Sequence, residues 1–195
     1  MERKEWKAGN MLYPLPVVMV TSQRPGERPN IITIAWTGTI CSDPPMLYVS
    51  IRKERYSYNI IKETGEFVVN LVGAGQIRQC DWCGVKSGRD FDKFEETGLT
   101  PVPSVKVAAP TIKECPVSIE CKVRKIEELG SHDMFIAEVV AVTVSDEYMD
   151  DQGRFAMEEA DMVAYLHGQY YGLGEYLGKF GYSVEKKKRN THIEK

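Results

Sequence analysis

The stretch Thr33–Pro45, TIAWTGTICSDPP, decides how the rest of the chain is interpreted. It begins as a β-strand, because Thr, Ile and Trp favour extended backbone, and it stops at two prolines, which cannot donate to a strand ladder. A strand that only filled a core would carry more Val, Ile or Leu, since burial of apolar area stabilises a core. The hydroxyls, the small residues and Trp36 therefore indicate a strand that contributes to a binding site.

The composition is that of an ordinary globular protein. The chain has 195 residues, of which 43% are hydrophobic and 27% charged, and this size and balance fit one compact domain. We expect a single domain over residues 1–195, with a core at about 11–183 and a basic tail at 184–195 that contains the run Lys186–Arg189. The net charge of −3 offers no basic face, so we expect no nucleic-acid partner.

The N-terminal segment and the cysteines predict a cytoplasmic protein. MERKEWKAGN lacks the apolar core of a signal peptide. No apolar stretch approaches the ~20 residues that a membrane-spanning helix needs, so we expect no contact with a membrane. The five cysteines are an odd number, and without an export signal we expect free thiols in a reducing cytoplasm.

The hydrophobic pattern predicts a mainly β fold with short helices. We expect strands at 15–23, 30–41, 46–52, 66–72 and 116–126, and a long strand from 130 that ends in an Asp-Asp-Gln-Gly turn at 150–153. Residues 117–124 alternate, which predicts one buried and one wetted face. A short helix follows Ser57, its predicted N-cap, and stops at Gly65. Brief connections favour a closed or nearly closed antiparallel barrel over a parallel α/β sheet.

Two short motifs point to other kinds of protein. FVVNLVGAGQIRQC, residues 67–80, mimics the start of a dinucleotide-binding unit, but Arg78 replaces its third glycine and no strand ending in an acidic residue follows. Cys80 and Cys83 form a C-x-x-C motif, CDWC, which fits a redox pair or half of a zinc site. Structural thiols are favoured, because free cysteine is commonly just buried, but a metal or redox module stays open as an alternative.

Several polar features together suit a flat ring that carries a phosphate. RKERYSYN places Arg52 near Ser57 at a predicted helix start, where free amides, a hydroxyl and guanidinium groups attract an anion. SGRDFDKF adds Ser87 and Lys93 in a loop. His132 follows a Gly-Ser turn, from which an imidazole can reach a ligand oxygen. Each of these features alone also fits a solvent-exposed turn. Because they occur together with a polar strand, we favour a ligand-binding site.

In their order and spacing these segments resemble the flavin reductase-like family, the FMN-binding split barrel, and most closely its flavoredoxin branch. The resemblance covers roughly residues 11–183 and rests on PLPVVMVTS, NIITIAWTGTICSDPPMLYVSI, SYNIIKETGEFVVNL, CGVKSGRDFDKF, ECPVSIEC, GSHDMFIAEV and GLGEYLGKFG. It implies a six-stranded antiparallel Greek-key split β-barrel with flanking helices, a homodimer, and FMN held non-covalently near the dimer interface.

The resemblance also implies which residues bind FMN. Asn30 and Trp36 match positions that touch FMN, and the segment from Thr33 to Ser42 is implied to line the ring and the ribityl chain. Ser57 matches a phosphate-binding hydroxyl, and Tyr165 matches an aromatic position near the ring. The predicted cofactor-binding residues are Asn30, Thr33, Ile34, Ala35, Trp36, Thr37, Ser42, Arg52, Ser57, Ser87, Lys93, His132 and Tyr165.

The predicted function is an FMN-binding oxidoreductase that accepts electrons or hydride from NAD(P)H or a protein donor and passes them on. No residue is predicted to be a catalytic acid or base, because the flavin carries the chemistry, and no residue is predicted to bind a metal. A flavoredoxin-type electron carrier without NAD(P)H oxidase activity is the first alternative. The C-x-x-C metal or redox module is the second.

Overall fold

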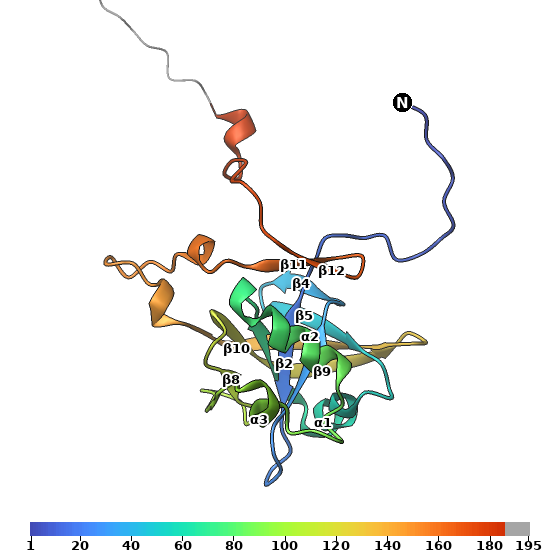
Figure 1. Ribbon diagram of the computed structural model, residues 1–195, viewed down its shortest axis with the longest axis vertical. Coiled ribbons are helices and arrows are strands. Elements are labelled where there is room, and N and C mark those ends of the chain that lie inside the picture. The colour runs from blue at the N-terminus through green and yellow to red at the C-terminus, as the bar shows by residue number, and fades with distance from the viewer. Residues whose placement is uncertain (186–195) are drawn as a thin grey trace, which may run out of the picture.

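A computed structural model describes residues 1–185, so the basic run Lys186–Arg189 lies outside the described residues. The main element is a seven-stranded sheet in the order β3-β2-β6-β9-β10-β5-β4, and all of its pairings are antiparallel (Figure 1). Its strands are β2 (Val18–Ser22), β3 (Asn30–Ile34), β4 (Thr37–Ser42), β5 (Pro45–Ile51), β6 (Glu66–Leu71), β9 (Val117–Glu128) and β10 (Asp133–Val144). Strands β3 and β4 form the two edges, so the barrel is split rather than closed. The predicted mainly β, split-barrel fold is confirmed.

The sheet has seven strands instead of the predicted six because the stretch 30–41 is not one strand. It breaks at Ala35 and Trp36, where the Thr37 amide donates to the Ala35 carbonyl at 3.0 Å. At the break the Ser50 amide donates to the Trp36 carbonyl at 2.8 Å. The chain thus leaves the ladder with β2 and enters the ladder with β5. Pro45 opens β5, a position at which a missing N–H is tolerated, so the prediction that it ends strand pairing is wrong.

The sheet curls around a core of apolar side chains, of which Phe67 and Phe135 are the largest that are fully buried. The alternation predicted for β9 holds only in its second half. Ser118 and Glu120, predicted to be wetted, are buried. The Ser118 hydroxyl donates to Asn70 Oδ1 at 2.7 Å, and Glu120 accepts the amides of Val105 and Lys106 at 2.8 and 2.6 Å. Hydrogen bonds from a crossing loop therefore replace water on that face.

Three helices flank the sheet. Helix α1 (Tyr56–Thr64) follows β5, and α2 (Ile77–Val85) and α3 (Lys93–Thr97) lie against β3 (Figure 1). Gly65 ends α1 in the left-handed conformation with φ 70°, as predicted. The predicted N-cap is wrong: Arg55 is the cap, and Ser57 is already inside the helix, buried. Apolar residues of α2 and α3 share a second cluster with β2 and β3.

A small second sheet covers one end of the main sheet. It has the order β1-β11-β12 and consists of β1 (Leu15–Pro16), β11 (Val163–Leu166) and β12 (Gln169–Gly172). The predicted long strand from 130 ends earlier than expected, at Val144, where a 3-10 turn at Asp146–Tyr148 begins. The predicted turn at 150–153 is present, with the Gly153 amide donating to the Asp150 carbonyl at 2.9 Å.

The remaining elements are short. They are the pair β7 (Pro101–Val102) and β8 (Thr111–Ile112), and 3-10 turns at Ala74–Gln76, Met157–Glu159 and Tyr182–Val184. Beyond β12 the chain runs away from the body, and the first residues of the chain do the same (Figure 1). Among the helices of residues 1–185, none combines the length and the apolar character required to cross a membrane.

Candidate functional site

Two adjoining cavities lie along β3 and the break that follows it. The first, here called the aromatic cavity, has a volume of about 430 Å³ and is lined by Asn10, Val17, Ile32, Thr33, Ile34, Ala35, Trp36, Ser50, Ile51, Arg52, Arg55, Ser131, His132, Tyr165 and Tyr170. The second, here called the basic cavity, measures about 250 Å³ and is lined by Asn30, Ile32, Glu54, Arg55, Tyr56, Ser57, Cys83, Lys86, Ser87, Gly88, Arg89 and Lys93. They share Ile32 and Arg55, so one elongated ligand can occupy both.

Ring side chains from three separate segments meet at the aromatic cavity. The rings of Trp36 and His132 are nearly parallel, at 6° with centroids 6.2 Å apart. Tyr165 of β11 is tilted against Trp36 at 6.4 Å, and Tyr170 of β12 is tilted against Tyr165 at 5.9 Å. Flat aromatic surfaces favour a flat ligand, because stacked and tilted rings attract one another.

His132 is a neutral hydrogen-bonding group in this cavity. Burial, and then the charge of Arg52, lower its pKa, so the imidazole is uncharged at pH 7. Its Nδ1 lies 2.9 Å from the Ser131 hydroxyl. A neutral imidazole has one donor and one acceptor nitrogen, so His132 can recognise a polar edge of a ring without adding charge.

Two hydroxyls of the strand segment, those of Thr33 and Thr37, are engaged within the protein. The Thr33 hydroxyl donates to the Cys80 carbonyl, and that of Thr37 donates to the Tyr48 carbonyl at 2.5 Å. The cavity is instead lined by consecutive residues from Ile32 to Trp36, which a regular strand would direct to alternate faces. The break at Ala35 and the free edge of β3 explain this, since both bring backbone groups to the surface of the cavity.

Lys93 is the most unusual group of the basic cavity because its side chain is only 3% exposed. Its Nζ donates to the carbonyls of Ile31 and Cys83 at 2.7 and 2.6 Å. Burial lowers its pKa to about 8. An ammonium group has three donors, so one remains to reach a ligand in the cavity.

Ser57 adds a fixed hydroxyl at the start of α1. It is 1% exposed and accepts a hydrogen bond from Asn30 Nδ2 at 2.6 Å, which leaves its own proton free to donate. The first amides of a helix lack partners within the helix and carry partial positive charge. Together with Lys93, this end of α1 forms a site that suits an anion.

The loop at 86–89 closes the outer side of the basic cavity. A Cβ atom on Gly88 would lie only 1.9 Å from Asn30 Oδ1, so this loop packs tightly against Asn30. Arg28 donates to the Gly88 carbonyl at 3.0 Å, and Arg89 donates to the Glu54 carbonyl at 3.1 Å. These two bonds tie the loop to both neighbouring segments.

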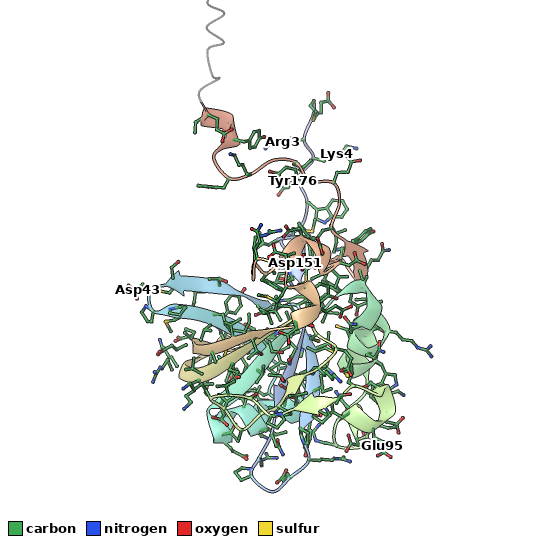
Figure 2. The ribbon with its side chains drawn as sticks, turned by 90° about the vertical axis from the view of Figure 1, so that its left-hand side faces the viewer. Arg3, Lys4, Asp43, Glu95, Asp151 and Tyr176 are labelled. Carbon is green, nitrogen blue, oxygen red and sulfur yellow. The ribbon has the colours of Figure 1, made fainter. Side chains whose placement is uncertain are left out.

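Most of the predicted site residues line one of the two cavities. Thr33, Ile34, Ala35, Trp36, Arg52, His132 and Tyr165 line the aromatic cavity, and Asn30, Ser57, Ser87 and Lys93 line the basic cavity. Thr37 and Ser42 line neither of these two cavities. After the break β4 runs away from the site, and Ser42 is exposed beside Asp43, which lies at the tip of a projecting hairpin (Figure 2). Of the segment that is predicted to contact the cofactor, residues 33–36 line a cavity, and the contribution of Thr37 and Ser42 stays a prediction.

Sequence reasoning did not include several lining residues in the site. Tyr170 was hidden among the aromatic residues of YLHGQYYGLGEY, where nothing distinguishes one ring from the next. Arg55 was visible as a cation beside Arg52, but its place in both cavities depends on the turn before α1. Gly88 carried a signal in principle, since glycine permits a close approach of the backbone to a neighbouring group.

The C-x-x-C motif is not joined by metal-binding side chains from the described part of the chain. Within residues 1–185, no group of three or more His, Cys, Asp or Glu side chains is arranged to hold a metal ion. All five cysteines, which belong to this part of the chain, are free thiols. Burial raises the pKa of Cys80 to about 12 and that of Cys83 to about 11, so both stay protonated at neutral pH.

Comparisons with known proteins agree with this architecture. Residues 10–174 match the family model described as the flavin reductase like domain. The structure of flavoredoxin of Desulfovibrio vulgaris (Miyazaki F) is similar with a TM-score of 0.87 and 35% identity, over 94% of this chain and 100% of that chain. Flavoredoxin from Methanosarcina acetivorans is similar with a TM-score of 0.81 and 28% identity, over the same shares. An uncharacterized protein of Archaeoglobus fulgidus is 38% identical over 139 residues, 71% of this chain and 77% of that protein.

Proposed function

Since the chain belongs to the flavin reductase like family, a flavin-binding family, we propose that it is an FMN-binding oxidoreductase that accepts electrons or hydride from NAD(P)H or a protein donor and passes them on. The observation that carries this proposal is the junction of an aromatic cavity with a basic one. The first suits a flat ring, and the second suits a phosphate group at the end of a short chain.

The donor set of the basic cavity favours the mononucleotide. Lys93, Ser57 and the first amides of α1 are hydrogen-bond donors suited to a phosphate, and Arg55 adds charge at the junction. The loop at 86–89, tied down through Gly88 and Arg89, bounds a cavity of only about 250 Å³, which suits a phosphate better than a further nucleotide. FMN therefore fits these residues better than FAD.

Bound FMN supplies the transfer of one or two electrons, and the protein supplies binding and orientation. Trp36 and Tyr165 hold the ring plane, and His132 offers a neutral donor or acceptor at its edge. Lys93 and Ser57 anchor the phosphate. No acid or base is assigned, because none of these roles moves a proton.

A second candidate function is that of an electron carrier that exchanges electrons only with proteins. The similarity to two flavoredoxin structures favours it. Anaerobic mixing with NADH or NADPH separates the two functions. Rapid bleaching of bound flavin supports the NAD(P)H-dependent enzyme, and stable yellow colour that bleaches with a reduced protein donor supports the carrier.

We further propose a homodimer in a reducing cytoplasm. The segment after β12 exposes Leu173, Tyr176, Leu177 and Phe180, and Figure 2 shows that Tyr176 lies away from the body. Large apolar side chains in such number favour burial against a second copy. Light scattering of the full chain tests this, with twice the chain mass of 22.1 kDa as the expected result. The five free thiols support the proposed compartment.

The cofactor assignment is tested by the pigment and by titration. We expect the purified protein to be yellow and to release FMN on denaturation. We also expect the apoprotein to bind FMN more tightly than riboflavin or FAD. A colourless protein whose Trp fluorescence is not quenched by any flavin would contradict the proposed function.

A further inference from the structure

The motif CDWC at residues 80–83 has no part in the proposed chemistry, yet its backbone bonds to a residue of each cavity. Cys80 and Cys83 are three residues apart on α2, so they share one helix face, and both are buried in the core. The Cys80 carbonyl accepts from Thr33 of the aromatic cavity, and the Cys83 carbonyl accepts from Lys93 of the basic cavity. The backbone of this one turn therefore fixes a residue in each cavity.

Asp81 points away from that buried face and holds a third part of the site. The Tyr170 hydroxyl donates to Asp81 Oδ1 at 2.8 Å. The Tyr170 ring lines the aromatic cavity and packs on Tyr165, which in turn is tilted against Trp36. A carboxylate on α2 thus anchors a chain of rings that covers the cavity.

The hairpin that carries Tyr170 packs its residues Val163, Tyr165 and Tyr170 against the second apolar cluster, but its own sheet is small. In the part of the chain that the structure describes, β12 is an edge strand paired only with β11. Strand β11 pairs with only two residues of β1, Leu15 and Pro16, and Met162 before it forms an isolated bridge with Gly73. A hairpin with so small a sheet is marginal without a further attachment, and a hydrogen bond to a charged group is stronger than one between neutral groups.

We propose that Asp81 is a positioning residue of the flavin site, which holds the β11–β12 hairpin as a roof over the aromatic cavity through Tyr170. This inference rests on the proposed function. In this inference the CDWC motif is a structural turn that connects the aromatic cavity, the basic cavity and the β11–β12 hairpin. Asp81 is expected to act on the aromatic cavity alone, because Lys93 of the basic cavity is held by the backbone carbonyl of Cys83.

The test uses the full chain with two variants that remove the same hydrogen bond, Asp81→Ala and Tyr170→Phe, and their double variant. Tyr171→Phe is the matched control, because its hydroxyl bonds only to Gln169 within the hairpin, at 2.5 Å. The dissociation constants of FMN and riboflavin are measured for each. We expect both ligands to bind about fivefold more weakly in either single variant, as for the loss of one hydrogen bond. The double variant is expected to match the singles, since one bond is lost in all three.

A conservative variant and a measurement without ligand complete the test. Asp81→Asn keeps an acceptor oxygen and is expected to restore most of the affinity. In the apoprotein, amide hydrogen exchange at 163–172 is expected to be several-fold faster in Asp81→Ala than in wild type or Tyr171→Phe. Wild-type affinity for both flavins in Asp81→Ala, or unchanged exchange in the hairpin, would overturn the inference. Failure of the wild-type chain to bind any flavin would contradict the proposed function instead, and the exchange measurement would still decide the role of Asp81.

Discussion

The two cavities differ in how firmly their residues are held. In the basic cavity Asn30, Ser57 and Lys93 are all buried, and each makes a hydrogen bond to a neighbour in the absence of ligand. In the aromatic cavity Trp36 and Tyr165 are only half-buried, and they contact one another through tilted rings. The basic cavity is therefore preorganised for one kind of group, whereas the aromatic cavity tolerates small changes of ring position.

This difference can be measured by comparing FMN with riboflavin, which has the same ring but no phosphate. A change in the basic cavity should weaken FMN and leave riboflavin nearly unchanged. A change in the aromatic cavity should weaken both ligands by a similar factor. The ratio of the two dissociation constants thus reports which cavity is affected, independently of any loss of overall stability.

Gly88→Ala is expected to have the largest effect. The added Cβ would meet Asn30 Oδ1 at 1.9 Å and Tyr56 Cδ1 at 2.8 Å, so the buried amide or the loop must move. Overpacking of this kind costs about 3 kcal/mol, and the affinity for FMN should fall about a hundredfold while that for riboflavin changes little. Gly75→Ala is the matched control, because nothing lies within 4 Å of its Cβ position. Equal losses for FMN and riboflavin would show that the loop does not belong to the phosphate side.

Ser57→Ala is expected to have the next largest effect. It removes a buried donor from the phosphate side and the acceptor of the Asn30 amide, which lies at 2.6 Å. Loss of a charge-assisted hydrogen bond costs about 1.5–3 kcal/mol, so titration should give at least a tenfold weaker affinity for FMN. Thr64→Ala, at the other end of α1, removes a hydroxyl that bonds the Ile60 carbonyl and should leave both flavins unaffected. FMN affinity equal to wild type would argue against the phosphate assignment.

Trp36→Ala is expected to weaken FMN and riboflavin alike, by about tenfold, since stacking on an aromatic side chain contributes about 1–3 kcal/mol. Its ring contacts both His132 and Tyr165, and no hydrogen bond of the basic cavity depends on it. Fluorescence titration of the variant with each flavin checks the prediction. If the variant lost affinity for FMN but not for riboflavin, Trp36 would act on the phosphate, and the proposed division of the site into two cavities would be wrong.

Most residues that the sequence predicts for the site line one of the two cavities, but the local geometry was predicted less well. Local signals were sufficient for Gly65 as the end of α1 and for the existence of the strands, because both depend on backbone preferences of a few residues. Ser57 and Lys93 are predicted from the sequence to bind the cofactor, but their burial is not, since it depends on the distant residues Asn30, Ile31 and Cys83.

The failures have one physical origin, which is that tertiary contacts override local pattern. The break at Trp36 follows from a bond to Ser50, and the burial of Glu120 follows from a loop at 105–106. The role of Asp81 depends on Tyr170, which is 89 residues away in the sequence. Spacing along the chain contains no signal for such pairs, and a family resemblance transfers only those positions that the motif already names.

A pH dependence is expected to separate the cavities without any mutation. Burial lowers the pKa of Lys93 to about 8 in the free protein, whereas a bound phosphate dianion would stabilise its charged form and raise that pKa. FMN binding then requires protonated Lys93, so the affinity is constant well below pH 8 and falls above it, by about twofold from pH 7 to 8 and about tenfold by pH 9. The phosphate monoester itself loses its second proton near pH ~6 and does not titrate in this window. Isothermal titration with FMN and riboflavin across this range checks the sign: riboflavin should show a flat profile, and an FMN affinity that rises with pH would contradict a charged Lys93 at the phosphate.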